Sequence, residues 1–367
     1  MSDPRIQKLA RLLVQYCVAV QPGDKVLING SQTAFPLLKE TFREVLRAGG
    51  HPFNNWREDE LMEILLKEGS DEQLSHVAEP TRLLYETYDC SINIAAATNT
   101  RILSGIDPTR QRLVQKASQP IMATVMQRSA AGDFRWVATM FPTAAYAQDA
   151  DMSVSDYEEF VFNACYLDKS DPVAEWQRMA AQQAALIAWL SDKKQVAVKG
   201  PNVDLTLSIA GRTFVNGDGR HNMPCGEIFT GPVEQSVNGW VRFTYPAIHQ
   251  GREVDGIELR FEEGRVVAAS AQKNEEFLQS VLATDEGARY LGEFAIGTNQ
   301  GISRFTRSIL FDEKIGGTIH LAVGAGYPES GSQNKSAVHW DMICDMRDGG
   351  QIWVDGELFY DSGRFVV

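Results

Sequence analysis

His339 and Asp341 are the pair of side chains with the clearest capacity for chemistry in this sequence. They lie in the segment 338–343 (VHWDMI). Residues two apart in an extended strand point to the same face, so this imidazole and this carboxylate would project together. Such a pair suits a divalent metal ion, and it is equally consistent with a strand that carries two polar residues on its solvated face.

His320 occupies a second strand-like segment, 318–324 (TIHLAVG), which runs into a glycine-rich turn, 324–329 (GAGYPE). That turn would bring Tyr327 close to the end of the strand that carries His320. A tyrosine hydroxyl there can reach a metal ion or donate a hydrogen bond to a developing oxyanion. Taken alone, His320 is consistent with a core histidine that forms a hydrogen bond, and Tyr327 with an aromatic side chain that covers the sheet.

Two glutamates stand in unusual settings, because each directly follows a glycine and directly precedes apolar residues. Glu227 lies in 222–232 (NMPCGEIFTGP) and Glu293 in 290–299 (YLGEFAIGTN). An unpaired buried carboxylate costs several kcal/mol, so each should meet a cation. The cation would be either a metal ion or an arginine such as Arg220 or Arg304.

These side chains are more informative as a group than singly. Three carboxylates, two histidines and a tyrosine gather in the second half of the chain, each at a strand end or a glycine-flanked turn. A carboxylate-rich site with few histidines fits two divalent ions about 3.5–4 Å apart, with a bridging water as the nucleophile. The chemistry predicted for such a site is hydrolysis of an amide or an ester.

Four ordered segments resemble the metal-binding motifs of the thermophilic-type aminopeptidases, peptidase family M29. They are MPCGEIFTGP, LGEFAIGTN, GTIHLAVGAGYPES and NKSAVHWDMI. The resemblance extends into the first half, through WVATMFPTAAYAQDADMS and YEEFVFNACYLDKSDPVAEW, and therefore covers most of the chain.

The resemblance implies a metallo-aminopeptidase that acts on peptides with a free N-terminus. It implies a homodimer with an α/β first domain and a β-rich second domain that holds the site. The cofactors would be two divalent ions of zinc, cobalt, manganese or magnesium. The implied metal ligands are Glu227, Glu293, His320, Tyr327, His339 and Asp341.

We hypothesise roles for these residues within the implied two-metal site. Glu227 and Asp341 would be the shared ligands, Glu293 would complete one ion, and the two histidines would complete the other. Glu227, Glu293 and Tyr327 are the expected catalytic residues, with Tyr327 at the edge as a weak ligand or a hydrogen-bond donor to the tetrahedral intermediate.

The sequence departs from the family pattern at two places. The segment between Tyr327 and His339 is short, so the preference of family members for peptides of a given length cannot be assumed for this chain. Cys225 stands where many members have aspartate before Gly-Glu. We expect Cys225 to be a buried neutral thiol.

Two alternatives belong to other functional classes. His320, His339 and Asp341 would suffice for a mononuclear iron(II) site of the ring-cleaving dioxygenases that open dihydroxypyridines, but the two glutamates would then be surplus. The other alternative is a non-catalytic peptide-binding relative. It would have no physical reason to keep buried carboxylates.

The composition excludes several partners. Lysine and arginine total 35 against 48 acidic residues in 367, which gives a net charge of −13. An acidic chain is a poor ligand for nucleic acid or for an anionic membrane. The five cysteines show no CxxC pair, and the N-terminal segment has the pattern of an amphipathic helix, so we expect a cytoplasmic protein.

The first half alternates strand-like and helical segments, which is typical of a mostly parallel sheet covered by helices. The expected strands are 25–29, 51–55, 90–96, 120–125 and 136–140. The expected helices are one at the N-terminus and others at 34–48, 58–67, 71–88, 154–166 and 172–191.

From residue 195 onward the chain consists of short strands and tight turns, interrupted mainly by a helix at 274–283. We therefore predict an α/β scaffold domain over 1–192 and a β-rich, barrel-like domain over 193–367 that carries the metal site.

Overall fold

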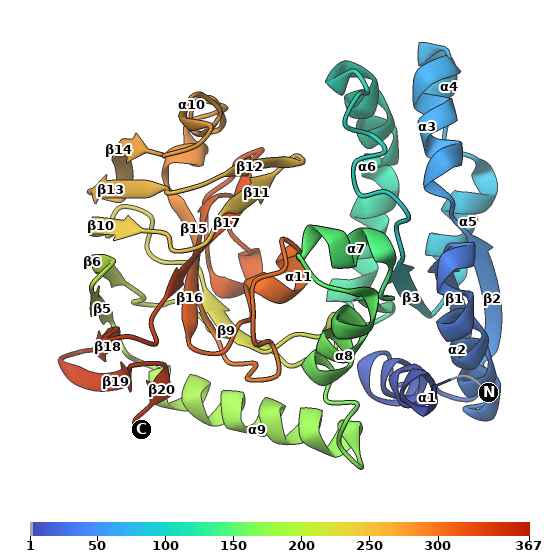
Figure 1. The fold of residues 1–367 in the computed structure, drawn as a ribbon, viewed down its shortest axis with the longest axis horizontal. Coiled ribbons are helices and arrows are strands. Elements are labelled where there is room, and N and C mark those ends of the chain that lie inside the picture. Colours follow the sequence, from blue (N-terminus) through green and yellow to red (C-terminus); the bar gives the residue numbers. More distant parts are fainter. Residues whose placement is uncertain (1–2) are drawn as a thin grey trace. The chain divides into compact units, whose positions relative to one another are not determined.

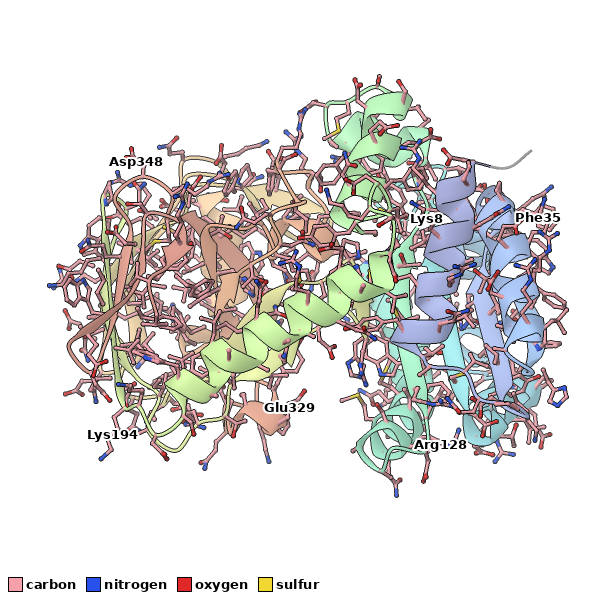
Figure 2. All side chains as sticks on the ribbon, turned by 90° about the horizontal axis from the view of Figure 1, so that it is seen from below. Lys8, Phe35, Arg128, Lys194, Glu329 and Asp348 are labelled. Carbon is pink, nitrogen blue, oxygen red and sulfur yellow. The ribbon has the colours of Figure 1, made fainter. Side chains whose placement is uncertain are left out.

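The computed structural model describes residues 3–367, and the chain forms two compact units (Figure 1). Unit 1 comprises Met1–Val173 and Gly219–Met223, and unit 2 comprises Ala174–Asp218 and Pro224–Val367. Lys8, Phe35 and Arg128 belong to unit 1, whereas Lys194, Glu329 and Asp348 belong to unit 2 (Figure 2).

Unit 1 is built on a five-stranded parallel sheet with the order β2-β1-β3-β4-β8. Its strands are β1 (Lys25–Gly30), β2 (His51–Trp56), β3 (Cys90–Ala95), β4 (Arg135–Met140) and β8 (Asn222–Met223). The expected parallel α/β sheet is thus confirmed. β8 comes from a segment far along the chain, and its main-chain carbonyl at Met223 accepts a hydrogen bond from Thr139.

Helices precede, connect and follow these strands. They are α1 (Pro4–Arg11), α2 (Phe35–Arg47), α3 (Asp59–Glu68), α4 (Asp71–Leu74), α5 (Glu79–Thr87), α6 (Pro108–Ala130), α7 (Ala144–Asp149) and α8 (Val154–Ala164), with a π-helix at Leu12–Cys17 and a 3-10 turn at Gln32–Ala34. The β1–α2–β2 and β3–α6–β4 connections run in opposite directions along the strand order. Right-handed crossovers therefore place α2 and α6 on opposite faces of the sheet.

One predicted strand is wrong. The segment 120–125 (PIMATV) lies inside helix α6 rather than in the sheet. Asp107 caps that helix by accepting a hydrogen bond from the Thr109 N–H, and Pro108 occupies its first turn. The cap and the packing of the Leu113 side chain against a small core cluster favour a helix over the strand propensity of the segment. The segment expected as one helix at 71–88 is likewise divided into α4 and α5.

Unit 2 is antiparallel and β-rich, as expected. An eight-stranded sheet has the order β14-β13-β10-β6-β5-β18-β19-β20, a five-stranded sheet has the order β17-β16-β15-β9-β7, and β11 pairs with β12. Its strands are β5 (Gln195–Gly200), β6 (Val203–Ser208), β7 (Val215–Gly217), β9 (Glu227–Thr230), β10 (Asn238–Arg242), β11 (Ala247–His249), β12 (Arg252–Val254), β13 (Glu258–Glu262), β14 (Arg265–Ser270), β15 (Leu291–Gly297), β16 (Thr318–Gly324), β17 (His339–Asp345), β18 (Gln351–Val354), β19 (Glu357–Asp361) and β20 (Arg364–Phe365).

The helices of this part of the chain are α9 (Pro172–Leu190), α10 (Glu275–Leu282) and α11 (Ile309–Asp312), with single turns at Gly287–Arg289 and Pro328–Ser330. The two large sheets share one hydrophobic core. Ile319, Leu321 and Val323 of β16 enter that core, which leaves the alternate residues of β16 on the opposite face of the sheet.

The two units divide the chain at residues 173 and 174, near the start of α9, and the boundary that we expect at residue 192 falls just after its end. The division into a scaffold domain and a catalytic domain stays a prediction. Within residues 3–367, no helix combines the length and the apolar character that a membrane span requires.

Candidate metal centre

The candidate metal centre lies on one face of the five-stranded sheet of unit 2. Strand register puts its members side by side: Gly297 of β15 opposes Glu227 of β9, Ala295 opposes His320 of β16, and Ala322 opposes Asp341 of β17. Because alternate residues share a face, Glu293, His320, His339 and Asp341 all project in the same direction. Four neighbouring strands therefore each contribute at least one of the predicted ligands.

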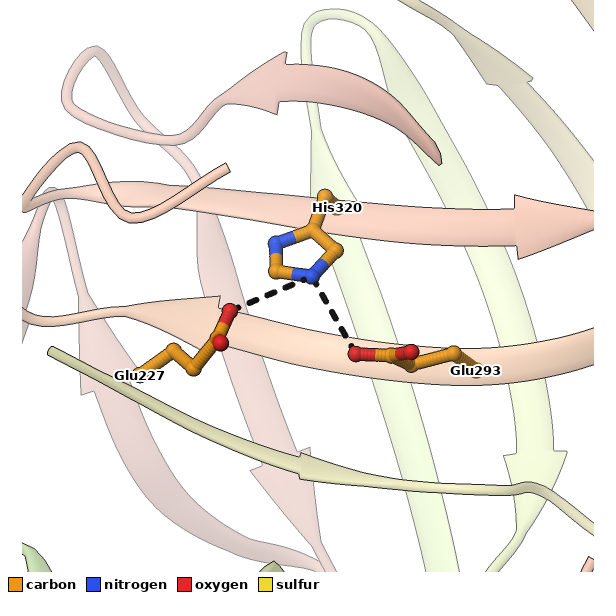
Figure 3. A group of neighbouring side chains, drawn as sticks. All are labelled: Glu227, Glu293 and His320. Carbon is orange, nitrogen blue, oxygen red and sulfur yellow. Dashed lines mark hydrogen bonds and ion pairs between the residues drawn. The ribbon is translucent and has the colours of Figure 1, made fainter. Parts of the chain in front are cut away.

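Glu227, Glu293 and His320 form the most deeply buried part of the centre (Figure 3). The Nε2 atom of His320 lies 3.4 Å from Glu227 Oε2 and 3.3 Å from Glu293 Oε1. The side chains expose 8%, 6% and 1% of their surface for Glu227, Glu293 and His320, so water screens their charges little.

Glu293, His339 and Asp341 form a second group of mutually close ligand atoms. The Nε2 atom of His339 lies 3.6 Å from Glu293 Oε2 and 3.5 Å from Asp341 Oδ2. The Nδ1 atom of His339 lies 2.7 Å from the main-chain oxygen of Ala325, and this contact fits an Nδ1–H donor. That tautomer leaves the Nε2 lone pair facing the carboxylates, as metal-ligating histidines require.

Glu293 is common to both groups, and each of its carboxylate oxygens faces a different histidine. A β-bulge between Leu291 and Glu293 sets this orientation. A Cβ on the intervening Gly292 would come within 2.2 Å of the Ala325 main-chain oxygen, so only glycine fits there. The hypothesis in which Glu227 and Asp341 are the shared ligands stays a prediction, since Asp341 also belongs to two of the three groups of close ligand atoms.

Glu313 and Lys314 join the centre, although neither was predicted from the sequence. Glu313 lies close to His320 and Asp341 in a third group of ligand atoms. Lys314 is fully buried, forms an ion pair with Glu313 and places its Nζ 3.8 Å from Glu227 Oε1. Glu227 thus meets His320 and a lysine as its cations. In the sequence these residues form a Glu-Lys pair just before a buried strand. They neither follow a glycine nor alternate within a strand, so the patterns that indicated the other candidate ligands do not apply to them.

The centre contains lone pairs that the described residues do not satisfy. Glu227 Oε2, His320 Nδ1 and Asp341 Oδ1 are buried side-chain atoms without a hydrogen-bond partner among residues 3–367. Buried polar atoms are normally hydrogen-bonded. Four carboxylates and two imidazoles with such orphaned atoms are the oxygen and nitrogen donor set that divalent metal ions prefer. The residues present therefore fit a metal site.

The pKa shifts of the acidic side chains follow from this crowding. Burial raises the pKa of Glu293, although its hydrogen bond with His320 opposes that change. Burial would also raise the pKa of Asp341, but the hydrogen bond with His339 and the charges of His339, His320 and Lys314 lower it.

The neighbouring carboxylates raise the pKa of both imidazoles in the metal-free centre. Burial would lower the pKa of His320, but Glu293 and Glu227 raise it. Burial would lower the pKa of His339 too, but Asp341 and Glu293 raise it to about 9. The carboxylates therefore attract positive charge to both histidines.

Tyr327 lies beside the carboxylates and histidines at a more open position. Its ring centroid is 5.3 Å from that of Phe229 and 5.2 Å from that of His339, and the residue is 40% exposed. Burial of its hydroxyl and the negative charges of Glu293, Asp341 and Glu227 raise its pKa. The hydroxyl is thus held as a proton donor next to the candidate metal centre.

Hydrogen bonds around β9 fix the approach of Glu227. Gln183 of α9 donates to the Glu227 main-chain oxygen at 2.8 Å, and Asn299 donates to the Cys225 main-chain oxygen at 2.8 Å. Gly226 has a φ of +110°, a backbone conformation that residues other than glycine rarely adopt. Cys225 is buried, as expected, and its thiol contacts Glu227 Oε1 at 3.8 Å.

Comparison with protein families places the chain among metalloproteases. The model of the thermophilic metalloprotease family (M29) matches residues 2–365. Aminopeptidase 2 of Geobacillus stearothermophilus is 29% identical, over 94% of this chain and 93% of its own length. Aminopeptidase T of Thermus aquaticus is 27% identical, over 96% of this chain and 94% of its own length.

Comparison with solved structures shows the same fold. Wild-type AmpT from Thermus thermophilus superimposes with a TM-score of 0.87, covers 99% of both chains and is 24% identical. The architecture of an α/β part and an antiparallel β-rich part is therefore that of a known protein.

Proposed function

This chain belongs to the M29 family of thermophilic metalloproteases, and we propose that its catalytic centre is the carboxylate–histidine cluster of the five-stranded sheet. The chain is a metal-dependent aminopeptidase, a hydrolase that removes N-terminal residues from peptides. The observation that carries the assignment of the centre is the pair of three-residue ligand groups that share Glu293.

The two ligand groups correspond to two ion positions. Glu227, Glu293 and His320 would hold one ion, and Glu293, His339 and Asp341 would hold the other. Glu293 is the bridging ligand in this proposal, because its Oε1 faces His320 and its Oε2 faces His339. When bound, divalent ions supply an acidified water and polarise the scissile carbonyl.

Residues around the ligands contribute positioning and charge. Glu313 adds a fourth carboxylate next to His320 and Asp341, and Lys314 holds Glu227 and Glu313 in place by ion pairs. Tyr327 keeps its proton because burial and nearby carboxylates raise its pKa, so it can donate a hydrogen bond to the oxygen that becomes negative during hydrolysis. The positively charged α-amino group of the substrate would be recognised by the acidic residues of the cluster.

The ring-cleaving dioxygenase alternative fits the centre less well. A mononuclear iron(II) site of two histidines and one carboxylate would leave Glu227 and Glu293 buried and unused, with the half-buried Glu313 beside them. A non-catalytic relative would leave the same carboxylates buried without a purpose. The density of carboxylates therefore supports a hydrolytic two-metal centre.

We also propose a cytoplasmic homodimer. The five cysteines are buried and none forms a disulfide within residues 3–367, which fits a reducing compartment. For the dimer contact we propose the α2–β2 patch, which comprises five exposed apolar residues: Phe35, Phe42, Leu46, Phe53 and Trp56. β2 lies at the edge of its sheet, so an antiparallel β2 of a second copy can continue the sheet and cover these side chains.

The test uses metal-free protein, with zinc, cobalt, manganese or magnesium added back singly. Hydrolysis of aminoacyl-anilides is measured beside the same compounds with an acetylated amino group. We expect at least one metal to restore cleavage of the free-amino substrates alone. Absence of cleavage with every metal, or equal cleavage of the acetylated compounds, would contradict the proposal.

Two variants link the activity to the centre. Glu227→Gln keeps the shape of a proposed ligand but removes its charge, and we expect at least a hundredfold loss of kcat/KM. Glu276→Gln on the exposed face of α10 is the matched control and should retain full activity. Full, chelator-insensitive activity of Glu227→Gln would overturn the assignment of the centre.

A further inference from the structure

A crevice lies in unit 1, at the point where the connections of the parallel sheet diverge. β1 and β3 are neighbours, but the chain leaves β1 toward β2 and leaves β3 toward β4 on the other side. Loops that depart in opposite directions open a crevice outside the carboxyl ends of such strands, and open α/β sheets bind ligands there. The peptidase proposal uses no residue of this unit.

The crevice is a cavity of about 330 Å³. Small residues at the strand ends, among them Gly30 of β1 and Ala95 of β3, line it. The volume is at the lower end of the range for small-molecule sites, about 300–1,000 Å³.

Asn29 and Asn93 line the crevice at the ends of their strands, and Asn55 extends this row of asparagines beyond it. Asn29 of β1 lies in register with Asn55 of β2 and Asn93 of β3. Asn29 donates to Asn93 at 2.8 Å and accepts from Asn55 at 2.8 Å. Asn29 is only 2% exposed. Buried parallel strands are normally apolar throughout, so the sheet itself does not require this polar row.

Two opposite charges line the same crevice without pairing with each other. Arg57 and Asp59 follow the end of β2 and line the crevice, and no ion pair joins them among residues 3–367. Arg57 donates one guanidinium N–H to the Tyr85 hydroxyl, which leaves other N–H groups available. Burial and the neighbouring Glu60 and Glu58 raise the pKa of Asp59, as expected for a carboxylate that lacks a cation.

These features select one class of ligand. A cation and an anion on the same cavity wall complement a small molecule that carries both charges. Phosphate ligands are disfavoured, because Glu58, Asp59 and Glu60 are acidic and the loop after β1 (SQTA) has no glycine-rich phosphate fingerprint. Alanine side chains at 95–97 leave room for a small or medium apolar group.

We propose that this crevice binds a free α-amino acid, with its carboxylate on Arg57 and its ammonium group on Asp59. The Tyr146 hydroxyl, which accepts from the Ala97 N–H, lies on the same wall and can donate to the carboxylate. The ligand class follows from the charges of the crevice alone. Its interpretation as a product of peptide hydrolysis, sensed away from the catalytic centre, rests on the proposed function.

The test is isothermal titration calorimetry on the full-length, metal-free protein, without any peptide substrate. The probes are glycine, L-alanine and L-leucine, together with leucinamide, which lacks the negative charge, and 4-methylpentanoate, which lacks the positive charge. We expect saturable binding of at least one amino acid and at least tenfold weaker binding of both analogues of leucine.

Two variants and two controls locate the binding. Asp59→Asn and Arg57→Gln should each weaken binding at least tenfold. Asp71→Asn is the matched control for the first, since Asp71 also lies in the first turn of a helix, and Arg82→Gln on α5 is the control for the second. Both controls should bind within twofold of the unchanged protein.

Three results would overturn the proposal: no binding of any amino acid, binding that both crevice variants retain, or equal binding of the singly charged analogues. None of these results depends on metal or on peptide cleavage, so the peptidase proposal fails or stands separately. Asp59→Asn should leave hydrolysis unchanged when no free amino acid is present.

Discussion

Glu293 links the two halves of the proposed metal site, because its two oxygens face different histidines. Its position in a strand that is buried along its whole length lets neither oxygen turn toward water. In the proposed two-ion site Glu227 and Asp341 would each hold only one ion, although Asp341 also lies close to His320 and Glu313.

Removal of a side chain that binds both ions should therefore lower the metal content of the protein more than removal of a side chain that binds one ion. We expect Glu293→Gln to abolish binding of both ions, whereas Glu227→Gln and Asp341→Asn each retain about one ion. Elemental analysis of the metal-saturated, desalted variants measures this, with Glu276→Gln as control. Retention of both ions by Glu293→Gln would show that another residue is the bridge.

His339 should make the metal-free protein sensitive to alkali. Asp341 and Glu293 raise its pKa from 6.5 to about 9 in the folded chain, although burial opposes this. A group whose pKa is higher in the folded state stabilises fully below its unfolded pKa and stops stabilising above its folded pKa. We expect the free energy of unfolding to fall between pH 6.5 and about 9.

The check is urea unfolding of the metal-free protein across that pH range, compared with His339→Gln. The variant lacks the titrating group, so its stability should change less between the two pH limits. Equal slopes in the two proteins would contradict the pKa assigned to His339.

At the scale of elements, the centre depends on how closely β15, β16 and β17 approach one another. Gly324 ends β16 opposite His339, with a φ of +98°, and a Cβ there would lie 2.1 Å from the Val338 main-chain oxygen. Glycine at this position thus allows the turn that leads toward Tyr327 and the strand pairing that presents His339.

Gly324→Ala should destabilise the protein through both backbone strain and a steric clash. Gly251→Ala is a matched control, since Gly251 has a φ of +75° but open space around its Cβ position. We expect Gly324→Ala to lower the free energy of unfolding by about 2 kcal/mol more than Gly251→Ala does. Urea denaturation measures the difference. An equal decrease in the free energy of unfolding for both variants would show that the main chain at Val338 can move away from the new Cβ without destabilising the protein.

For the molecule as a whole, bound metal should act as a stabilising ligand of unit 2. Clustered buried carboxylates repel one another, and divalent ions remove that repulsion. Metal at a hundredfold excess over its Kd adds about 2.7 kcal/mol, or a rise of about 5–10 °C in Tm. Thermal unfolding with a chelator and with added metal tests this. Glu293→Gln should show no such rise, and an equal rise in that variant would place the stabilising ions elsewhere.

The α2–β2 patch should control the oligomeric state. We expect Trp56→Glu to convert the proposed dimer into a monomer, because Trp56 is 51% exposed at the end of an edge strand and stacks on Phe35. Met122→Glu, at a residue of α6 that is 61% exposed, is the control. Light scattering after size-exclusion chromatography distinguishes the states, and a dimer that survives Trp56→Glu would place the contact elsewhere.

The sequence alone was sufficient for the fold class and the nature of the chemistry. Hydrophobic runs separated by helical segments predicted the parallel sheet, because periodicity reflects which face each residue buries. Glutamates between glycine and apolar residues, such as Glu227, predicted buried charge, since burial of a carboxylate demands a cation. Motif resemblance identified the family, which the match over residues 2–365 confirms.

Only the tertiary structure brought the candidate ligands into two groups that have Glu293 in common and added further residues to them. Glu293 stands between the two histidines because of strand register and a bulge, and neither can be read from local spacing. Glu313 and Lys314 reach the centre from a loop, where no periodicity indicates direction. Residues 120–125 lie in α6 because the capped helix around them outweighs their own strand propensity. A sequence records what each segment prefers, whereas side chains from distant segments meet only where packing brings their strands together.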